Sequence, residues 1–310
     1  MRKRSIAVLV MVSTVLFSGC SGYLQRMVTQ SIGRIGESIP DAPDTIKTAI
    51  IPDANLAVGW VGHATVLVQI RDKIILTDPL FTNTIGMLVK RFVKPGLDPA
   101  ILPKVDVTLI SHMHFDHFSF GSLEMIPKNG CLIVPDGLAR YTPDFGFNEV
   151  DMLKPWEAVE SNGIRITAVP VQHFNGRYGF DGAWLGNLGY TGYVVEYKGI
   201  VVFFGGDTGY NPDFFKEIGR RFKIDLALIP IAPGGGSGFG SRVHASPLGA
   251  LKICEDVGAK YMVPIHFGTM AYGSPPNADA QLQALRDAAA QEGMTDRIIA
   301  LRVGEQRVLF

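Results

Sequence analysis

The sequence contains little cysteine and no excess of either charge. Three of its 310 residues are cysteines, and 29 Lys and Arg residues balance 29 Asp and Glu residues. A chain without a basic excess lacks the electrostatic signature of a nucleic-acid binder, so we expect no nucleic-acid partner. Cys131 and Cys254 lie in apolar segments and could pair only if the fold brings them close; we expect buried free thiols. With 47% hydrophobic and 19% charged residues, the chain should be globular with a substantial core.

The apolar stretch near the amino terminus is too short to cross a bilayer. It runs over twelve residues, Ile6 to Phe17, whereas a spanning helix needs about 20. A basic segment precedes it and small residues lead to Cys20, a pattern that resembles a bacterial lipoprotein signal. We expect residues 1–19 to be a signal peptide and Cys20 to carry the lipid, with an ordinary secretory signal or an uncleaved anchor as alternatives. A serine directly after the lipidated cysteine, here Ser21, resembles the pattern of lipoproteins that are sorted to an outer membrane. We therefore expect the protein in the bacterial cell envelope, anchored in the outer membrane and facing the periplasm.

The remainder divides into a short tether and one large domain. Residues 20–52 are polar and contain the turn Pro40–Pro43, so we expect a tether there. From residue 53 to 310, strand-like runs alternate with helical stretches, and the strands fall into an early and a late group. Ala278–Glu292 reads as an amphipathic helix that ends at Gly293. The pattern predicts the α/β class, with two sheets face to face and helices outside.

The most informative segment places three imidazoles and a carboxylate within six residues. Val105–Ile110 reads as a buried strand, and His112 and His114 follow at its end, where alternation directs both to one side. Asp116 and His117 come after the chain turns, so they can face a second point. Two adjacent metal ions can use this arrangement. The alternative is a solvated, histidine-rich loop.

Three more polar residues follow apolar strands in the same manner. Open α/β sheets place binding groups at the carboxyl ends of their strands, where a stiff scaffold fixes ligand positions. The three are His173 after residues 163–169, Asp207 after residues 199–204, and His266 after residues 260–265. One histidine in such a place is unremarkable in a core or at a surface, but the repetition argues against coincidence.

These motifs together resemble metallo-β-lactamase-fold hydrolases. Within them, the chain is similar to the N-acylphosphatidylethanolamine-hydrolysing phospholipase D group and its bacterial relatives. The resemblance covers about residues 59–310. It rests on Trp60–Thr65, Leu76–Pro79, His112–His117, Gln172–Phe174, Gly206–Gly209 and Pro264–Thr269. It implies a four-layer αββα sandwich, with residues 53–310 as the catalytic domain.

The resemblance also implies a ligand set for two metal ions. His112, His114 and His173 would hold one ion, Asp116, His117 and His266 the other, and Asp207 would bridge them. Nitrogen and oxygen ligands suit two zinc ions, with iron or manganese possible. No cysteine stands in this set, which argues against the zinc β-lactamases that use one. His114, where a Glu would otherwise stand, argues against the related di-iron oxidoreductases.

Five further residues are candidates for roles around these ligands. Asp78 ends a strand and can brace a ligating imidazole, or simply form a turn with the next residue. His63 is expected beside the site and not on a metal. His244 precedes a helix and, by the resemblance, contacts the scissile group; the alternative is a loop residue at a helix cap. Arg177 could meet a phosphate or brace the site, and Tyr210 could line the pocket.

The predicted activity is metal-assisted hydrolysis. A hydroxide shared by two ions would attack the substrate, with Asp116 and His244 as the catalytic residues. The first hypothesis is a phosphodiesterase of small-molecule or lipid-like phosphodiesters. A lactone or carboxylic ester hydrolase on the same metals is the alternative. The third is a non-catalytic envelope lipoprotein that retains the fold, against which the full set of ligand positions argues.

Overall fold

The computed structural model describes the domain and part of the segment before it. The described residues are 29, 32–34, 36–85, 89–177, 181, 182, 186, 188–233, 242–270 and 278–310. The expected signal peptide, residues 1–19, and Cys20 lie outside these residues. Within the described part, no helix has both the length and the apolar character needed to cross a membrane.

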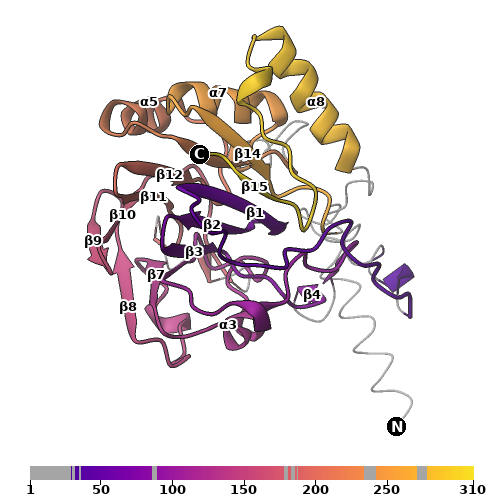
Figure 1. The fold of residues 1–310 in the computed structure, drawn as a ribbon, viewed down its shortest axis with the longest axis vertical. Coiled ribbons are helices and arrows are strands. Elements are labelled where there is room, and N and C mark those ends of the chain that lie inside the picture. The colour runs from indigo at the N-terminus through magenta and orange to yellow at the C-terminus, as the bar shows by residue number, and fades with distance from the viewer. Residues whose placement is uncertain are drawn as a thin grey trace.

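Two β-sheets pack face to face at the centre of the domain (Figure 1). The first has seven strands in the order β15 (Gln306–Val308), β1 (Leu56–Gly62), β2 (Thr65–Ile70), β3 (Lys73–Thr77), β6 (Val107–Leu109), β7 (Cys131–Pro135) and β8 (Glu149–Leu153). The second has six, in the order β14 (Tyr261–Ile265), β13 (Leu226–Pro230), β12 (Ile200–Phe204), β11 (Gly192–Tyr197), β10 (Ile164–Val169) and β9 (Ala158–Ser161). A small ribbon pairs β4 (Thr84–Ile85) with β5 (Val89–Lys90).

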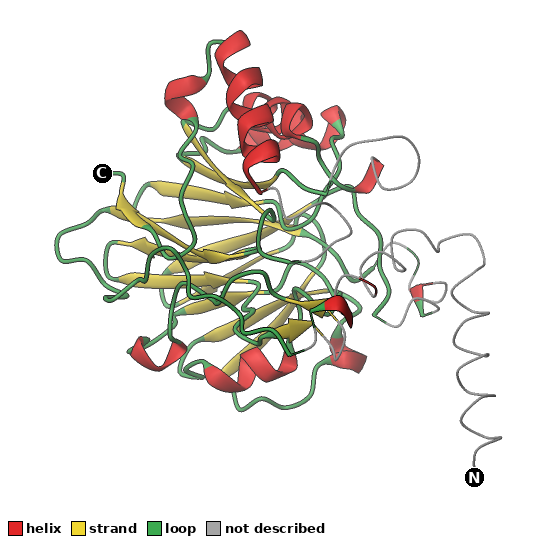
Figure 2. Cartoon of the chain, turned by 90° about the vertical axis from the view of Figure 1, so that its right-hand side faces the viewer, coloured by secondary structure: helices red, strands yellow, loops and turns green. Residues whose placement is uncertain are grey.

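Helices cover both outer faces of the sheet pair, so the strands lie between two helical layers (Figure 2). On one side are α5 (Pro212–Arg221), α7 (Pro247–Asp256) and α8 (Ala278–Gln291). On the other are α3 (Phe120–Met125) and the 3₁₀ helices η1 (Pro99–Ile101) and η2 (Ala139–Tyr141); η3 (Thr295–Arg297) follows α8. The αββα prediction is confirmed. Helix α8 also ends as expected, before Gly293 at φ +68°.

The inner strands of the first sheet, β1, β2, β3, β6 and β7, are buried on both faces, which explains their nearly continuous apolar sequences. The edge strands β8 and β15 are partly exposed. In β3, Ile75 faces the core between the sheets, whereas Ile74 and Leu76 face the core under α3. Burying a side chain of this size contributes about 1.5–3 kcal/mol.

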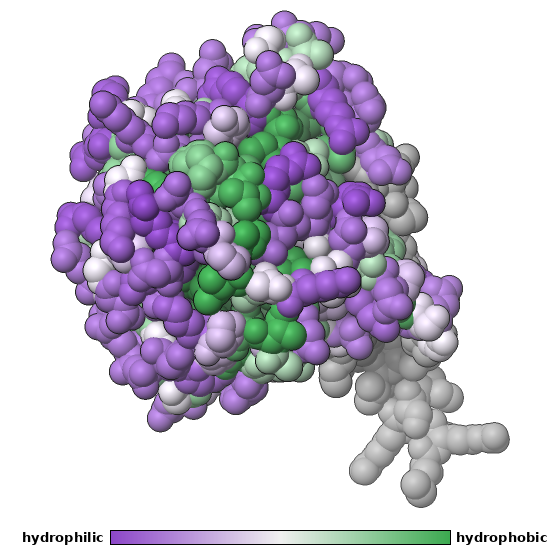
Figure 3. All heavy atoms as spheres, in the orientation of Figure 1, coloured by the Kyte–Doolittle hydropathy of each residue, from purple (hydrophilic) through white to green (hydrophobic). Residues whose placement is uncertain are grey.

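Cys131 and Cys254 are buried and free, as expected. The face in Figure 3 is mainly hydrophilic, with an apolar band running across it. Near the C-terminus, Val308 and Phe310 are exposed.

The last part of the expected tether packs on the domain. Ile46 is only 2% exposed, and its backbone N–H donates to the carbonyl of Gly96 over 2.8 Å. The Asp44 N–H donates to the carbonyl of Val303 over 3.1 Å. Gly304 is required at this crossing, because a Cβ there would lie 1.8 Å from the Asp44 carbonyl oxygen and its φ is +86°. From Asp44 onward the segment is therefore part of the folded surface.

Strand direction brings the candidate ligands to one edge. β3 and β6 are parallel neighbours in the first sheet. In the second, β10 and β12 point the same way, because each pairs antiparallel with β11, and β12, β13 and β14 are parallel. The loops after β3, β6, β10, β12 and β14 therefore leave the sandwich at the same edge. Those loops carry Asp78, the His112–His117 run, His173, Asp207 and His266.

Candidate metal centre

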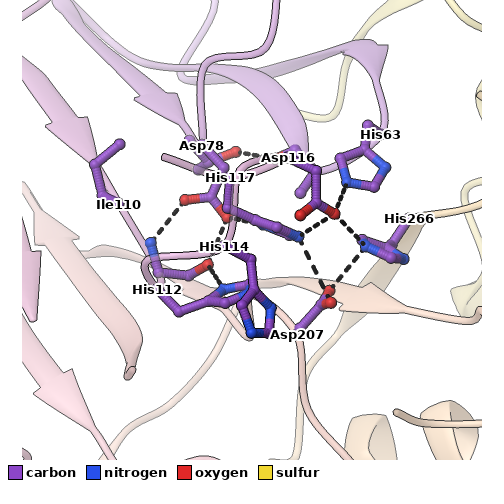
Figure 4. A network of polar contacts seen from close by, with 12 residues as sticks. His63, Asp78, Ile110, His112, His114, Asp116, His117, Asp207 and His266 are labelled. Carbon is purple, nitrogen blue, oxygen red and sulfur yellow. Dashed lines mark hydrogen bonds and ion pairs between the residues drawn. The ribbon is translucent and has the colours of Figure 1, made fainter. Parts of the chain in front are cut away.

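All seven histidines of the chain gather at this edge of the sandwich. With nearby aspartates they form overlapping groups of potential metal ligands, which are described below as two clusters. The loop after β6, residues 112–118, is called the ligand loop below. Figure 4 shows Asp116, His117, Asp207 and His266 pointing toward one another, with His63 on the far side of Asp116. The seven predicted ligands are therefore brought together from loops far apart in the sequence.

The first cluster consists of His112, His114 and His173. Nδ1 of His114 lies 2.8 Å from Nε2 of His112 and 3.4 Å from Nε2 of His173. One potential ligand atom from each residue lies within 4.8 Å of the others. This is the set that the resemblance assigned to one metal ion.

The second cluster consists of Asp116, His117, His266 and His63, with Asp207 beside it. Nε2 of His117 lies 3.2 Å from Oδ2 of Asp116 and 3.5 Å from Oδ2 of Asp207. Nε2 of His266 lies 3.2 Å from Oδ1 of Asp207. Asp207 also groups with His173 of the first cluster within 4.8 Å. Its carboxylate thus lies between the two clusters, the position expected of a bridging ligand.

Hydrogen bonds on the outer ring nitrogens determine which nitrogen faces inward in the first cluster. The Ser111 hydroxyl donates to Oδ2 of Asp78 over 2.5 Å, because an ionised carboxylate only accepts. Its oxygen then accepts from Nδ1–H of His112 over 2.9 Å. His173 Nδ1–H donates to the Val243 carbonyl over 2.9 Å. Nε2 of both imidazoles therefore carries a lone pair toward His114.

The second cluster is oriented in the same way. His117 Nδ1–H donates to Oδ2 of Asp78 over 2.6 Å, and His266 Nδ1–H donates to the Ala232 carbonyl over 2.9 Å. Both Nε2 atoms therefore direct lone pairs at the carboxylates of Asp116 and Asp207. Among the described residues, Nε2 of His117 and Oδ1 of Asp207 are buried and make no hydrogen bond.

These donor atoms fit metal ions in chemistry and in spacing. Facing lone pairs repel one another unless a positive charge lies between them, and a divalent cation supplies that charge. Zinc bonds of 2.0–2.1 Å at tetrahedral angles place neighbouring ligand atoms about 3.3 Å apart. The distances above, 2.8 to 3.5 Å, bracket that value. The site is therefore suited to nitrogen- and oxygen-ligated metals, and the ligand set itself does not choose between zinc and iron.

The pKa values follow the same division. Burial lowers the pKa of His112 and His173 well below the usual range and that of His114 to about 4, so these rings are neutral ligands at neutral pH. Burial alone would also lower the pKa of His117, but nearby carboxylates, chiefly Asp116, raise it well above its usual value. The second cluster thus has a strongly negative field that favours a cation at Nε2 of His117.

Three residues of the centre adopt backbone conformations that favour glycine. His63, Asp78 and His266 have φ values of 59°, 32° and 62°. Such conformations cost roughly 1–3 kcal/mol each for other residues and persist where surrounding structure enforces them. Here the His266 N–H donates to the His63 carbonyl over 3.0 Å, which ties two of these residues together.

Of the other predicted site residues, His63 and His244 lie beside the ligands, whereas the Tyr210 hydroxyl does not reach them. His63 lies beside Asp116, with Nε2 3.0 Å from Oδ2, and burial lowers its pKa to about 3, so it is a neutral partner of that carboxylate. His244 has Nδ1 3.4 Å from Oδ2 of Asp207. Tyr210 does not reach the centre through its hydroxyl, which donates over 2.7 Å to Asp256 in the last turn of α7.

Arg177 is bonded to the backbone of the ligand loop. Its side chain is buried, with the residue 7% exposed, and Nη1 donates to the carbonyls of Met113 and Phe118. Of the two roles that the sequence left open for Arg177, a phosphate contact and a brace of the site, this placement supports the brace.

Three residues near the ligands were not predicted from the sequence. Ser111 connects Asp78 to His112, and its place directly before the first ligand was the available signal. Phe115 and Phe174 sit beside the ligands yet are 37% and 36% exposed. Nothing in the sequence separates these two from core aromatics, because exposure depends on packing.

Comparison with known proteins agrees with this geometry. Residues 73–267 match the family model described as a β-lactamase superfamily domain. The chain is 32% identical to the mitochondrial N-acyl-phosphatidylethanolamine-hydrolyzing phospholipase D of Saccharomyces cerevisiae, over 74% of this chain and 51% of that protein. It is 30% identical to a metal-dependent hydrolase of Methanoregula boonei, over 68% of this chain and 81% of that protein. A possible metal-dependent hydrolase from Veillonella parvula superposes with a TM-score of 0.66 at 16% identity, over 83% of this chain and 100% of that chain, and shows the same fold.

Proposed function

Because this chain belongs to the β-lactamase superfamily of metal-dependent hydrolases, we propose that it hydrolyses phosphodiester bonds in lipid-like substrates with two zinc ions. Iron or manganese could take the place of zinc in the same ligand set. The name of the yeast relative, a phospholipase D acting on an N-acylated phospholipid, supports the phosphodiester part. The match covers only about half of the yeast protein. The lipid-like part of the proposal therefore rests on the structure.

The observation that carries the lipid-like part is an exposed aromatic ring against the ligands, with a second exposed ring on the ligand loop. The Phe174 ring lies 4.6 Å from the His114 ring and 4.7 Å from the His173 ring, centroid to centroid. Phe115 lies between His114 and Asp116 in the ligand loop. Both rings keep more than a third of their surface exposed. Exposed rings beside a reaction centre favour a substrate whose scissile group is attached to an apolar body.

The chain's own residues suit hydrolysis at this place. When bound, two divalent cations would acidify a water molecule and polarise the phosphoryl group. Asp207 would be a ligand to both, and Asp78 holds His117 in the tautomer that binds. Burial lowers the pKa of His244, so its ring is neutral. That ring would take the proton released as water attacks phosphorus and pass it to the leaving oxygen as the P–O bond breaks.

The first prediction concerns substrate choice. Zinc-loaded enzyme should cleave a long-chain phosphodiester at least tenfold faster than a β-lactam in kcat/KM, which corresponds to about 1.4 kcal/mol. His244→Ala should lower kcat more than it raises KM, since proton transfer matters in the transition state. Steady-state kinetics on phosphodiesters of short and long chain, lactones, carboxylic esters and β-lactams measure both.

Three results of this panel would redirect the proposal. Ready opening of lactones or esters with intact phosphodiesters would assign the alternative hydrolase. Equal rates for short- and long-chain phosphodiesters, unchanged in Phe174→Ala, would keep the phosphodiesterase but remove the lipid-like substrate. A protein that binds zinc and cleaves nothing in the panel would favour the non-catalytic envelope lipoprotein.

We also propose that the protein is attached to the outer membrane of a bacterial envelope through a lipid on Cys20. Stable anchoring takes more than one acyl chain, as a lipoprotein amino terminus provides. Cys20→Ala should move the protein to the soluble envelope fraction or leave it unprocessed, whereas Cys131→Ala should fractionate as wild type. Fractionation and gel mobility measure this. A Cys20→Ala variant that fractionates and migrates like wild type would rule out the lipid.

A further inference from the structure

Arg177 lies under the ligand loop and is bonded to both of its ends. The residue is 7% exposed. Its Nη1 donates to the carbonyl of Met113 and to that of Phe118, each over 2.9 Å. Between these carbonyls the chain carries three predicted ligands, His114, Asp116 and His117. A single nitrogen therefore sets the span of the loop that serves both clusters.

Aromatic rings surround the same guanidinium group. Its central carbon lies 4.4 Å from the Phe115 ring centre, 4.1 Å from that of Phe120 and 5.3 Å from that of Phe118. A planar guanidinium can stack face to face on such rings while the N–H groups at its edge donate hydrogen bonds, whereas an ammonium group has no planar face to stack. The guanidinium also packs against the ring of Phe115, a residue that is 37% exposed.

The backbone of Arg177 is anchored in turn. Its N–H donates to Oδ2 of Asp181 over 2.9 Å, and the same oxygen accepts from the Tyr141 hydroxyl over 2.6 Å. Arg177 stands four residues after His173, on the loop that follows β10 in the second sheet. The ligand loop follows β6 in the first sheet. Arg177 therefore connects the His173 segment to the ligands of the other sheet.

We propose that Arg177 is a positioning residue that holds the ligand loop in its metal-binding geometry. A loop with free ends samples many arrangements, and a metal ion that binds must select the productive one. By fixing both carbonyls, Arg177 removes that cost before the metal arrives. Its effect falls on metal binding and reaches the substrate only through the metals. The inference does not depend on which ester the enzyme cleaves.

The test compares Arg177→Lys with Arg165→Lys in the full chain. Arg165 is exposed, lies on β10 ahead of the same loop and pairs with Glu160 and Glu196, so it controls for loss of a guanidinium. We measure zinc per chain, the rate of zinc transfer to a competing chelator, and Tm with and without zinc. Arg177→Lys should release zinc at least about tenfold faster, and zinc should raise its Tm by less than it raises that of wild type. Arg165→Lys should match wild type.

A merely structural role gives a different result. It would lower Tm equally with and without zinc and leave zinc release unchanged, and either finding overturns the proposal. Unchanged zinc release with a raised KM for an anionic phosphodiester would instead identify a substrate contact and also overturn it. If Arg177→Lys does not fold, Asp181→Ala decides, because it loosens the anchor and keeps the guanidinium. Zinc release at the wild-type rate in that variant overturns the proposal.

Discussion

Asp207→Ala should lower kcat by at least about 10³-fold, or roughly 4 kcal/mol of barrier. The carboxylate lies between the two ligand clusters, with oxygens 3.2 Å from His266 Nε2 and 3.5 Å from His117 Nε2. If two metal ions bind as proposed, its removal would take a ligand from both metal positions and leave two cations facing each other without a shared negative charge. Metal content should therefore fall below two ions per chain. Steady-state kinetics and elemental analysis of the same preparation measure the two effects.

Asp213→Ala is a suitable control for this variant. Asp213 is an exposed carboxylate in the first turn of α5, so its loss should cost a few tenths of a kcal/mol in stability and no activity. The bridging role is excluded if Asp207→Ala keeps two metal ions per chain and wild-type kcat. Active wild-type protein without any transition metal would exclude the metal mechanism altogether.

Asp78→Ala should weaken metal binding at both positions, by about 10- to 100-fold. One carboxylate accepts from His117 Nδ1 directly and reaches His112 Nδ1 through the Ser111 hydroxyl. Without this carboxylate, one imidazole in each cluster is no longer held in the tautomer that can bind a metal ion. It also leaves buried donors on Ser111 and His117 unpaired, at about 1–3 kcal/mol each. Calorimetric titration of metal-free protein with zinc, together with its Tm, measures the loss.

Ser111→Ala separates the two positions. It removes the link to His112 but leaves the bond between Asp78 and His117, so one zinc ion should bind more weakly and the other nearly normally. Thr108→Val is the matched control: Thr108 is a neighbour on β6, and its buried hydroxyl makes no hydrogen bond among the described residues. If Ser111→Ala lowers the affinity for both zinc ions equally, or for neither, the hydrogen bonds through the serine hydroxyl are not what orients His112.

The fold and the common location of the candidate ligands could largely be predicted from the sequence, because both depend on local pattern. The run at His112–His117 and the single residues after β10, β12 and β14 follow buried apolar strands, and strands of like direction end at a common edge. The amphipathic pattern of α8 and its end at Gly293 are local in the same sense. The packed segment from Asp44 was missed because its polar composition resembles a linker, while a few contacts such as that of Ile46 hold it down.

The order of residues along the chain shows which residue types follow each strand, and those residues were enough to predict a metal-dependent hydrolase of this fold. How each of these side chains acts depends on its neighbours in the folded chain. The inward nitrogen of His173 depends on a carbonyl 70 residues away in the chain. Arg177 became a brace under the loop because Met113 and Phe118, 64 and 59 residues from it, lie against its guanidinium. Hydrogen bonds and burial depend on neighbours in space, and a sequence pattern specifies neighbours only within a few residues.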